Sequence, residues 1–246
     1  MATSGFQFKK FSIQQDRCAM KVGTDGVLLG AWTSVGPDTS RILDVGSGTG
    51  LISLMMAQRC PHAEIDGVEL DPEAFEQGVE NFEQSPWDLN LFNYHASFQE
   101  FVEEIENQYD LIISNPPFFD HGDRPEDPRK LARDKTTLPL EDLISGAGRL
   151  LSEQGRLALV LPADHEKNLL ALLSKFNFVL TRITRVRGRA QTPVKRILVE
   201  CSKEINEKTA EDAGQKTIVS ELIIELQRHD YTEEFKALVR EFYLKM

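Results

Sequence analysis

The chain has 246 residues, of which 41% are hydrophobic, and its formal net charge at pH 7 is −11. This length accommodates a single α/β domain with one core. No apolar run reaches the roughly 20 residues that a transmembrane helix requires, and residues 1–10 lack the apolar block of a signal peptide, so we expect a cytoplasmic protein.

The cysteines and histidines form no pattern that is typical of a metal site. Cys18, Cys60 and Cys201 are scattered, odd in number and without C-x-x-C spacing, which indicates reduced thiols and not a disulfide framework. None of the five histidines forms an i, i+4 pair, the spacing that two ligands on one helix face would need. We therefore expect no metal.

Short apolar segments alternate with helical patterns through the first half of the chain. Strands are predicted at residues 41–45, 64–69, 89–94 and 109–114, and helices at residues 50–59, 72–84 and 97–107. Strands that alternate with helices at this spacing are typical of βαβ units. The sequence therefore predicts an α/β fold with a doubly wound, mostly parallel sheet.

The second half continues the alternation and then closes the sheet with an antiparallel hairpin. The elements expected are helices at 140–151, 163–173 and 233–244 and strands at 155–161, 178–186, 196–201 and 217–226. The last helix places Phe235, Leu238, Val239 and Phe242 on one face, which predicts that this face packs against the domain. Residues 202–216 are charged and poor in apolar side chains, which is typical of a mobile insertion.

Three glycines occupy the turn after the first predicted strand of the sheet. Gly46, Gly48 and Gly50 lead from this strand into a helix, where free backbone N–H groups can bind a polar ligand. The dinucleotide fingerprint G-x-G-x-x-G would need a third glycine where this chain has Leu51, so a ligand smaller than a pyrophosphate is favoured. Glu69 ends the next strand, where an acid can accept hydrogen bonds from both hydroxyls of a ribose.

The tetrapeptide Asn115-Pro116-Pro117-Phe118 follows the strand predicted at 109–114. Proline disfavours the helical region for the residue before it, so Asn115 and Pro116 are held extended. The Asn115 side-chain oxygen and the Pro116 carbonyl then offer two acceptors for one exocyclic amino group, and Phe118 offers a flat surface for a base to stack on. The alternative is a strand terminator followed by a core phenylalanine.

Two basic clusters interrupt the acidic composition, and phosphate binding depends on such local patches more than on net charge. One lies between residues 181 and 196, where Arg182, Arg185, Arg187, Arg189, Lys195 and Arg196 occur without an acid. The other, Arg124, Arg129, Lys130, Arg133 and Lys135, lies in the polar stretch 115–139, which is long enough to be a binding loop. The alternative is that the arginines only protect a solvated sheet edge.

The motifs Asp44 to Gly50 (DVGSGTG), Glu69 and Asn115 to Phe118 (NPPF) resemble those of class I S-adenosylmethionine (SAM) dependent methyltransferases that act on amino nitrogens. The stretches 6–11, 16–32, 84–87, 231–235 and 241–244 are similar to the family of bacterial tRNA1(Val) (adenine-37-N6)-methyltransferases. The resemblance spans nearly the whole chain. It implies a Rossmann-like sheet of seven strands in a single domain, residues 1–246, with residues 1–35 forming a cap over the cofactor.

The resemblance also implies roles for individual residues. The residues expected to contact SAM are Gly46, Gly48 and Gly50 at its methionine part, Glu69 at its ribose, Ser97 and Phe98 at its adenine, and Lys21 and Thr24, beside Asp25, above it. Asp44 would order the glycine loop. Ser97 stands where such enzymes usually carry an Asp, so its hydroxyl would bind adenine without charge assistance. Asn115, Pro116, Pro117 and Phe118 would hold the target base.

The leading hypothesis is a monomeric enzyme that transfers a methyl group from SAM to N6 of adenosine 37 in the anticodon loop of tRNA1(Val). Its expected RNA contacts are Arg129, Lys130, Arg133, Arg185, Arg187, Arg189 and Arg196. Two alternatives stay open: methylation of a protein glutamine or of an rRNA amino group, and a non-catalytic module that binds SAM and RNA. Phe118, where glutamine methyltransferases more usually have Tyr, disfavours the protein substrate, and intact Asn115 and Glu69 disfavour the non-catalytic module.

Overall fold

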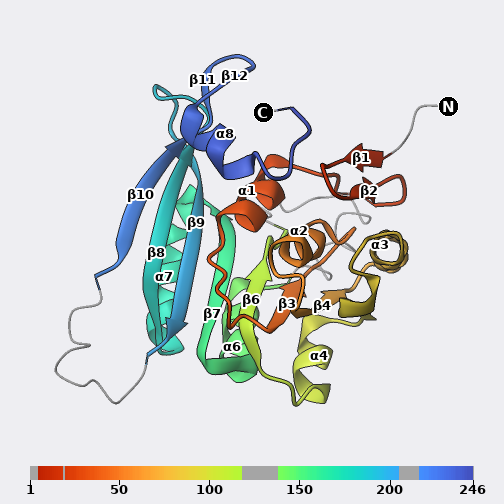
Figure 1. Ribbon diagram of the computed structural model, residues 1–246. Coiled ribbons are helices and arrows are strands. Elements are labelled where there is room, and N and C mark those ends of the chain that lie inside the picture. Colours follow the sequence, from red (N-terminus) through yellow and green to blue (C-terminus); the bar gives the residue numbers. More distant parts are fainter. Residues whose placement is uncertain (1–4, 19, 118–137, 205–215, 246) are drawn as a thin grey trace, which may run out of the picture.

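The computed structural model describes residues 5–18, 20–117, 138–204 and 216–245 (Figure 1). The central sheet contains β3 (Arg41–Val45), β4 (Glu64–Glu69), β5 (Leu91–His95), β6 (Tyr109–Ser114), β7 (Leu151–Pro162), β8 (Phe178–Arg187), β9 (Val194–Lys203) and β10 (Ile218–Ile223). The helices are α1 (Thr24–Trp32), α2 (Leu51–Arg59), α3 (Pro72–Glu83), α4 (Phe98–Glu104), α6 (Leu140–Leu150), α7 (Glu166–Lys175) and α8 (Glu233–Val239), with short 3-10 turns at Asp88–Asn90 and Ala163–His165.

The predicted doubly wound, mostly parallel α/β sheet is confirmed. Its strand order is β10-β8-β9-β7-β6-β3-β4-β5, and β9 is the strand that runs antiparallel to both of its neighbours. The expected number of seven strands is one too few. β10 adds an eighth because it pairs in parallel with the outer edge of β8, with Ile218 opposite Arg182. Hydrogen bonding to that free edge, which depends on the tertiary fold, decides whether a predicted strand joins the sheet.

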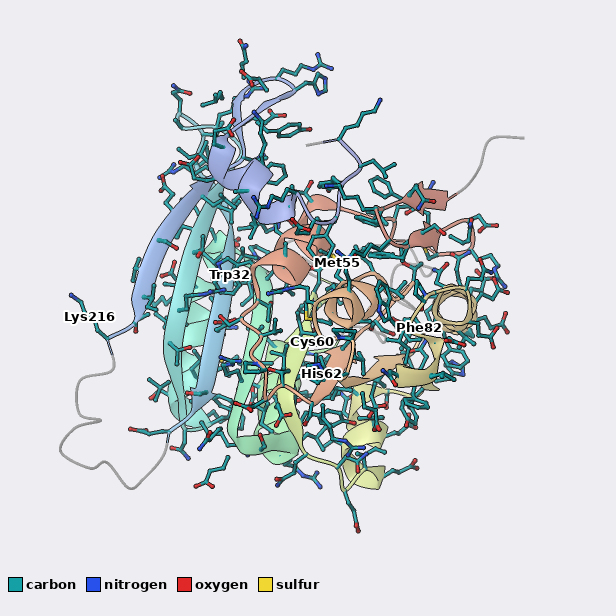
Figure 2. All side chains as sticks on the ribbon, viewed as in Figure 1. Trp32, Met55, Cys60, His62, Phe82 and Lys216 are labelled. Carbon is teal, nitrogen blue, oxygen red and sulfur yellow. The ribbon has the colours of Figure 1, made fainter. Side chains whose placement is uncertain are left out.

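Helices cover both faces of the sheet and enclose two apolar clusters (Figure 1). One cluster packs α1, α2, α3 and α8 against one face, and Met55 of α2 and Cys60, which follows α2, are buried in it (Figure 2). The other packs α4, α6 and α7 against the opposite face. Residues 111–113 of β6 and 157–161 of β7 are buried between the two clusters, which is why these stretches are apolar without alternation.

The two ends of the described chain lie side by side. The hairpin of β1 (Gly5–Gln7) and β2 (Ser12–Gln14) meets the segment after α8, where the N–H of Lys9 donates to the carbonyl of Phe242 at 2.8 Å. α8 is shorter than predicted, but its expected packing face is buried: Phe235, Val239 and Phe242 are almost inaccessible. A second small hairpin, β11 (Glu225–Gln227) and β12 (Asp230–Tyr231), precedes α8.

Predicted and observed boundaries differ most where one element runs into the next. β7 begins at Leu151, four residues before the predicted strand, because α6 ends directly at Leu150 without a loop. The strand expected at 217–226 is divided into β10 and β11, which belong to different sheets. Of the insertion expected at 202–216, Ser202 and Lys203 belong to β9, and residues 205–215 lie outside the described part of the chain.

The turn between β3 and α2 depends on its glycines. Gly46, Gly48 and Gly50 have φ angles of 72°, 55° and 81°, in the left-handed region that costs other residues roughly 1–2 kcal/mol. At Gly50 the space is closed as well, since a Cβ atom would lie 2.3 Å from Cε1 of Phe82 (Figure 2). Only glycine therefore allows α2 to begin directly against α3.

Replacing Gly50 with alanine should lower the free energy of unfolding by about 2 to 4 kcal/mol, the sum of left-handed strain and overpacking. Gly36→Ala is the matched control, because a Cβ at Gly36 meets no atom within 4 Å, and its stability should change by less than about 1 kcal/mol. Urea denaturation of both variants measures the difference. Equal stability of the two would contradict the stated role of Gly50.

Candidate active site at the carboxyl edge of the sheet

The strand order places the glycine loop and the Asn-Pro-Pro segment next to each other. β3 connects outward through β4 to β5, whereas β6 returns to the other side of β3, so the order reverses between β3 and β6. In open α/β sheets, ligands bind at the carboxyl ends of the strands beside this reversal. Val45 pairs with Ser114 at the last register position, so Gly46 and Asn115 leave the sheet from neighbouring strands.

A cavity of about 390 Å³ opens at this edge. Its lining includes eight of the predicted site residues: Gly46, Gly48, Glu69, Ser97, Phe98, Asn115, Pro116 and Pro117. Asp44 of β3 and Gly50, the last glycine of the loop, are buried and do not line the cavity. Phe118 lies outside the described residues.

Glu69 connects the glycine loop to the end of β4. Its Oε2 atom accepts the N–H of Gly48 and its Oε1 atom accepts the N–H of Asp71, both at 2.8 Å. The N–H groups of Gly46 and Ser47 add bonds to the carbonyl of Val68. Each carboxylate oxygen has further lone-pair capacity, so Glu69 can hold the loop and still accept from a ligand.

Asp44 orders the loop from its buried side. The Oδ2 atom accepts from the backbone N–H of Ser53 at 3.0 Å and from its hydroxyl at 2.7 Å, which fixes the start of α2. Oδ1 has no hydrogen-bond partner among the described residues. Burial raises the pKa of Asp44 to about 7; the bonds from Ser53 oppose this shift, and the charge of Glu69 adds to it.

The Asn-Pro-Pro segment is held at its base by β6. The hydroxyl of Ser114 donates to the carbonyl of Val45 at 2.7 Å, Pro116 is buried, and Asn115 is half-buried. α1 approaches Asn115 closely at Gly26, where a Cβ atom would lie 3.8 Å from the Asn115 amide nitrogen. Asn115 is thus fixed between the sheet edge and the start of α1.

Ser97 and Phe98 line the cavity but also have structural roles. The Ser97 hydroxyl accepts from the N–H of Glu100, and the Glu100 carboxylate accepts from the N–H of Ser97, forming a capping box at the start of α4. The hydroxyl also donates to this carboxylate. The Phe98 ring packs toward α6, where a Cβ at Gly146 would lie 2.5 Å from it. The sequence pattern S-x-x-E is typical of such a capping box and is the sequence signal for this structural role of Ser97.

The N-terminal segment reaches the cavity through residues that the sequence did not indicate. Cys18 and Met20 line it, whereas Lys21 and Thr24 are exposed and lie outside its lining. Asp25 pairs with Arg196 of β9 at 2.8 Å. The sequence does not indicate that Cys18, Met20 or Leu138 line the cavity, because only the tertiary fold brings them to it. Other lining residues that were not predicted follow predicted site residues or precede them in the sequence, so they could have been predicted from that proximity: Leu70, Asp71, Ala96 and Gln99.

The arginines of the run 181–196 are paired with acids from distant elements. Arg185 pairs with Glu166, Arg187 with Glu221, and Arg189 with Glu225. Side chains alternate between the faces of a strand, and Arg182 lies on the face opposite to Arg185 and Arg187, where its guanidinium stacks over Trp32 at 3.5 Å from the ring centroid. Arg189 follows the end of β8. Arg129, Lys130 and Arg133 lie outside the described residues.

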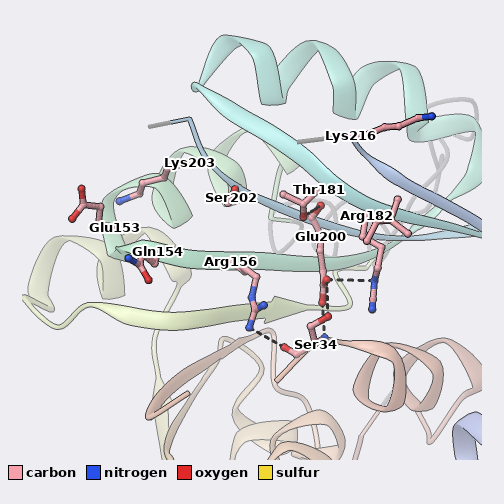
Figure 3. A pocket seen from close by; sticks show the side chains of 11 residues that line it. Ser34, Glu153, Gln154, Arg156, Thr181, Arg182, Glu200, Ser202, Lys203 and Lys216 are labelled. Carbon is pink, nitrogen blue, oxygen red and sulfur yellow. Dashed lines mark hydrogen bonds and ion pairs between the residues drawn. The ribbon is translucent and has the colours of Figure 1, made fainter. Parts of the chain in front are cut away.

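A second cavity of about 420 Å³ lies near the amino ends of the parallel strands (Figure 3). Its polar groups bind one another. Glu200 accepts from the backbone N–H and the hydroxyl of Ser34 and pairs with Arg182, while Arg156 donates to the Ser34 carbonyl. These contacts tie the segment after α1 to β9, and we assign this cavity a structural role.

The described residues contain no group of three or more His, Cys, Asp or Glu side chains placed to hold a metal ion. Within the same residues, no helix is both long and apolar enough to cross a bilayer. The three cysteines are free; Cys60 and Cys201 are buried.

Comparison with known proteins identifies the family. Residues 26–184 match the methyltransferase small domain. A protein of Christiangramia forsetii named tRNA1(Val) (adenine(37)-N6)-methyltransferase is 51% identical, with complete coverage of both chains. A protein of the same name from Flavobacterium johnsoniae is 48% identical over 98% of this chain and 100% of its own. The chain belongs to this family of methyltransferases.

Solved structures agree on the fold. A crystal structure of a predicted O-methyltransferase from Agrobacterium tumefaciens superposes with a TM-score of 0.67, at 21% identity, over 89% of this chain and 96% of its own. A ribosomal protein L11 methylase from Lactobacillus delbrueckii gives a TM-score of 0.53 at 15% identity, over 73% and 77% of the two chains. These likenesses place the fold among the methyltransferases.

The raised pKa of Asp44 predicts a pH-dependent stability. In the unfolded chain this carboxyl ionises near pH 3.8, whereas in the folded protein it stays protonated up to about pH 7. Asp44 therefore lowers the free energy of unfolding progressively as pH rises from about 4 to about 7. The variant Asp44→Asn has no carboxyl group that ionises, so its free energy of unfolding does not fall in this way. The difference in free energy of unfolding between the variant and the wild type should therefore increase in favour of the variant by on the order of 2 to 4 kcal/mol from about pH 4 to about pH 7.

Urea denaturation at several pH values measures this difference, with Asp110→Asn as a control of opposite sign. Burial acts to raise the pKa of Asp110, but hydrogen bonds from Ser40 and Arg41 lower it overall. Wild-type Asp110 therefore stabilises the fold above about pH 4, and this advantage is lost in acid. Parallel pH profiles for Asp44→Asn and the wild type would contradict the account of Asp44.

Proposed function

We propose that this protein transfers a methyl group from SAM to N6 of adenosine 37 in tRNA1(Val). The observation that carries the proposal is that the Gly46 loop and Asn115 share one cavity at the point where the strand order reverses. A nucleoside cofactor and an amino group can therefore meet there. Relatives of full length and up to 51% identity have the name of this activity.

The residues present fit SAM. Glu69 presents carboxylate oxygens that can accept from ribose hydroxyls, and Gly46 and Gly48 have no side chains, so that a ligand can approach the backbone at these two positions. Leu70, which is 39% exposed, and Ala96 provide an apolar surface for a flat base. When bound, SAM supplies a methyl group on a positively charged sulfur, which is a good leaving group.

Catalysis in this proposal is mainly positioning. The N6 amino group of adenine is conjugated with its ring and is a poor nucleophile. The Asn115 side-chain oxygen and the Pro116 carbonyl accept its two hydrogens, which favours a tetrahedral nitrogen with its lone pair directed at the methyl group. As the lone pair forms the new carbon–nitrogen bond, the carbon–sulfur bond would break and release S-adenosyl-L-homocysteine, and the cationic nitrogen would then lose one proton to solvent. No general base is needed before the transfer.

The RNA contacts belong to the proposal as well. A base in an anticodon loop is already single-stranded, so turning it into the cavity costs less than extrusion from a duplex. Arg185, Arg187 and Arg189 each pair with a carboxylate, so contact with phosphate requires exchange of that carboxylate for the RNA backbone. Arg196 pairs with Asp25 of α1, so its contact with phosphate requires the same exchange.

Asn115→Ala should lower methyl transfer by about 10² or more, the scale of losing one hydrogen-bond partner of a transition state, while SAM affinity stays within a few-fold. Incorporation of labelled methyl groups into tRNA1(Val) and calorimetry with SAM measure the two quantities. Asn90→Ala is the matched control, since Asn90 is half-buried like Asn115, donates to the Pro61 carbonyl and does not line the cavity. Near-normal turnover in Asn115→Ala would remove its role as the amino acceptor.

Glu69→Ala should show the opposite profile. It removes a charged hydrogen-bond partner of the ribose and the bond to Gly48, so we expect SAM affinity to weaken by about 1 to 3 kcal/mol. Calorimetry with SAM is the measurement. Unchanged affinity would exclude Glu69 from the ribose site, and a wild-type protein that binds SAM without methylating RNA would favour the non-catalytic alternative.

A further inference from the structure

One end of the cavity is lined by residues 96–99, a segment that comprises the link between β5 and α4 and the first two residues of α4. If Glu69 binds the ribose, as in the proposed function, the attached base lies beyond it, against Leu70 and Ala96, with its edge toward residues 97–99. The 6-amino group of adenine on that edge is a hydrogen-bond donor and needs an acceptor. The side chains of Ser97 and Gln99 are the polar ones available on this segment.

Ser97 is already committed to the helix. Its hydroxyl hydrogen is directed to the Glu100 carboxylate at 2.7 Å, and its oxygen accepts the N–H of Glu100 at 3.2 Å. Both bonds hold the Ser97 oxygen against the first turn of α4, so that only its one remaining lone pair could accept from a base. The residue at the position of the family's usual acid is thus a weaker candidate for binding adenine than an acceptor with no other partner.

Gln99, two residues further on, has a side chain of fixed polarity. Its amide nitrogen donates to the Asp142 carboxylate at 2.9 Å. An ionised carboxylate only accepts hydrogen bonds, so the NH2 group must be the end that faces α6, and the carbonyl Oε1 faces away from it. None of the hydrogen bonds found among the described residues uses Oε1, and Gln99 lines the cavity.

We propose that Gln99 Oε1 binds the 6-amino group of the cofactor's adenine, and that Asp142 is a positioning residue that keeps the amide in this orientation. A carbonyl acceptor selects the 6-amino group of adenine against the 6-oxo group of hypoxanthine, which is itself an acceptor. Without Asp142, the amide can turn by 180° and present NH2 instead. This inference rests on SAM as the cofactor, and it assigns recognition of the adenine to Gln99 in place of Ser97.

The test compares the binding of S-adenosyl-L-homocysteine and S-inosyl-L-homocysteine by calorimetry on the whole protein. We expect the wild type to prefer the adenosyl compound by about tenfold or more, the factor of one well-placed hydrogen bond together with the repulsion of two acceptors. In Gln99→Ala this ratio should fall about five- to tenfold, and in Asp142→Ala it should fall in the same direction. Gln99 is exposed, so the substitution leaves the core intact.

Two further variants separate this role from a structural one. The double variant Gln99→Glu with Asp142→Asn reverses the direction of the bond and leaves an acceptor on residue 99, so its preference should stay within about threefold of the wild type. Ser97→Ala should lower the melting temperature through loss of the cap and leave the ratio unchanged.

A ratio that falls in Ser97→Ala and not in Gln99→Ala would overturn the proposal and assign the adenine to Ser97. An equal ratio in Gln99→Ala and the wild type would overturn it with the proposed function intact. A wild-type protein that binds neither compound would instead contradict the proposed cofactor itself.

Discussion

The hydrogen bonds from Gly48 and Asp71 to the two oxygens of Glu69 are the interaction on which the rest of the site depends. Glycine accepts many backbone conformations, so the three glycines with positive φ do not fix the shape of the loop by themselves, and ordering them costs more conformational entropy than ordering other residues. Glu69 fixes them to the end of β4, and Asp44 fixes them from behind through Ser53. The loop is therefore ordered by the same carboxylate that we propose for the ribose.

The two ends of the cavity differ in chemistry, and this difference supports a mechanism by positioning. Glu69 and Asp71, two acids of the lining, lie at the end of β4, and the Asp71 side chain caps α3 by accepting the N–H of Ala74. The end of β6 offers an uncharged amide at Asn115 and buried proline backbone. An amino nucleophile that becomes acidic only after it is methylated needs hydrogen-bond acceptors at the end of β6 and no base. The acids at the end of β4 lie on the side that we propose for the cofactor.

Patterns local in sequence predicted most of the fold and the two motifs that face each other across β3 and β6. Short apolar segments predicted β3, β4 and β6, and local motifs indicated Gly46, Glu69 and Asn115, which line one cavity. Contacts between distant segments could not be predicted. The arginine run contains no acid, yet Glu166 and Glu221 neutralise Arg185 and Arg187 from α7 and β10. Met20 reaches the cavity only because its segment folds back over the strand ends. Ser97 was predicted to bind adenine, but its S-x-x-E pattern indicates a helix cap, which is the role it has at the start of α4.

The central claim is that this cavity places an adenine amino group of one tRNA against the methyl donor. The most direct measurement is mass-spectrometric mapping of an unmodified tRNA1(Val) transcript after incubation with the protein and SAM carrying a deuterated methyl group. The account predicts one labelled fragment, the one that contains adenosine 37, with the label released as N6-methyladenosine, and no label in a transcript with guanosine at that position. Label at another nucleotide or on a ring nitrogen of adenine, or no label at all, would contradict it.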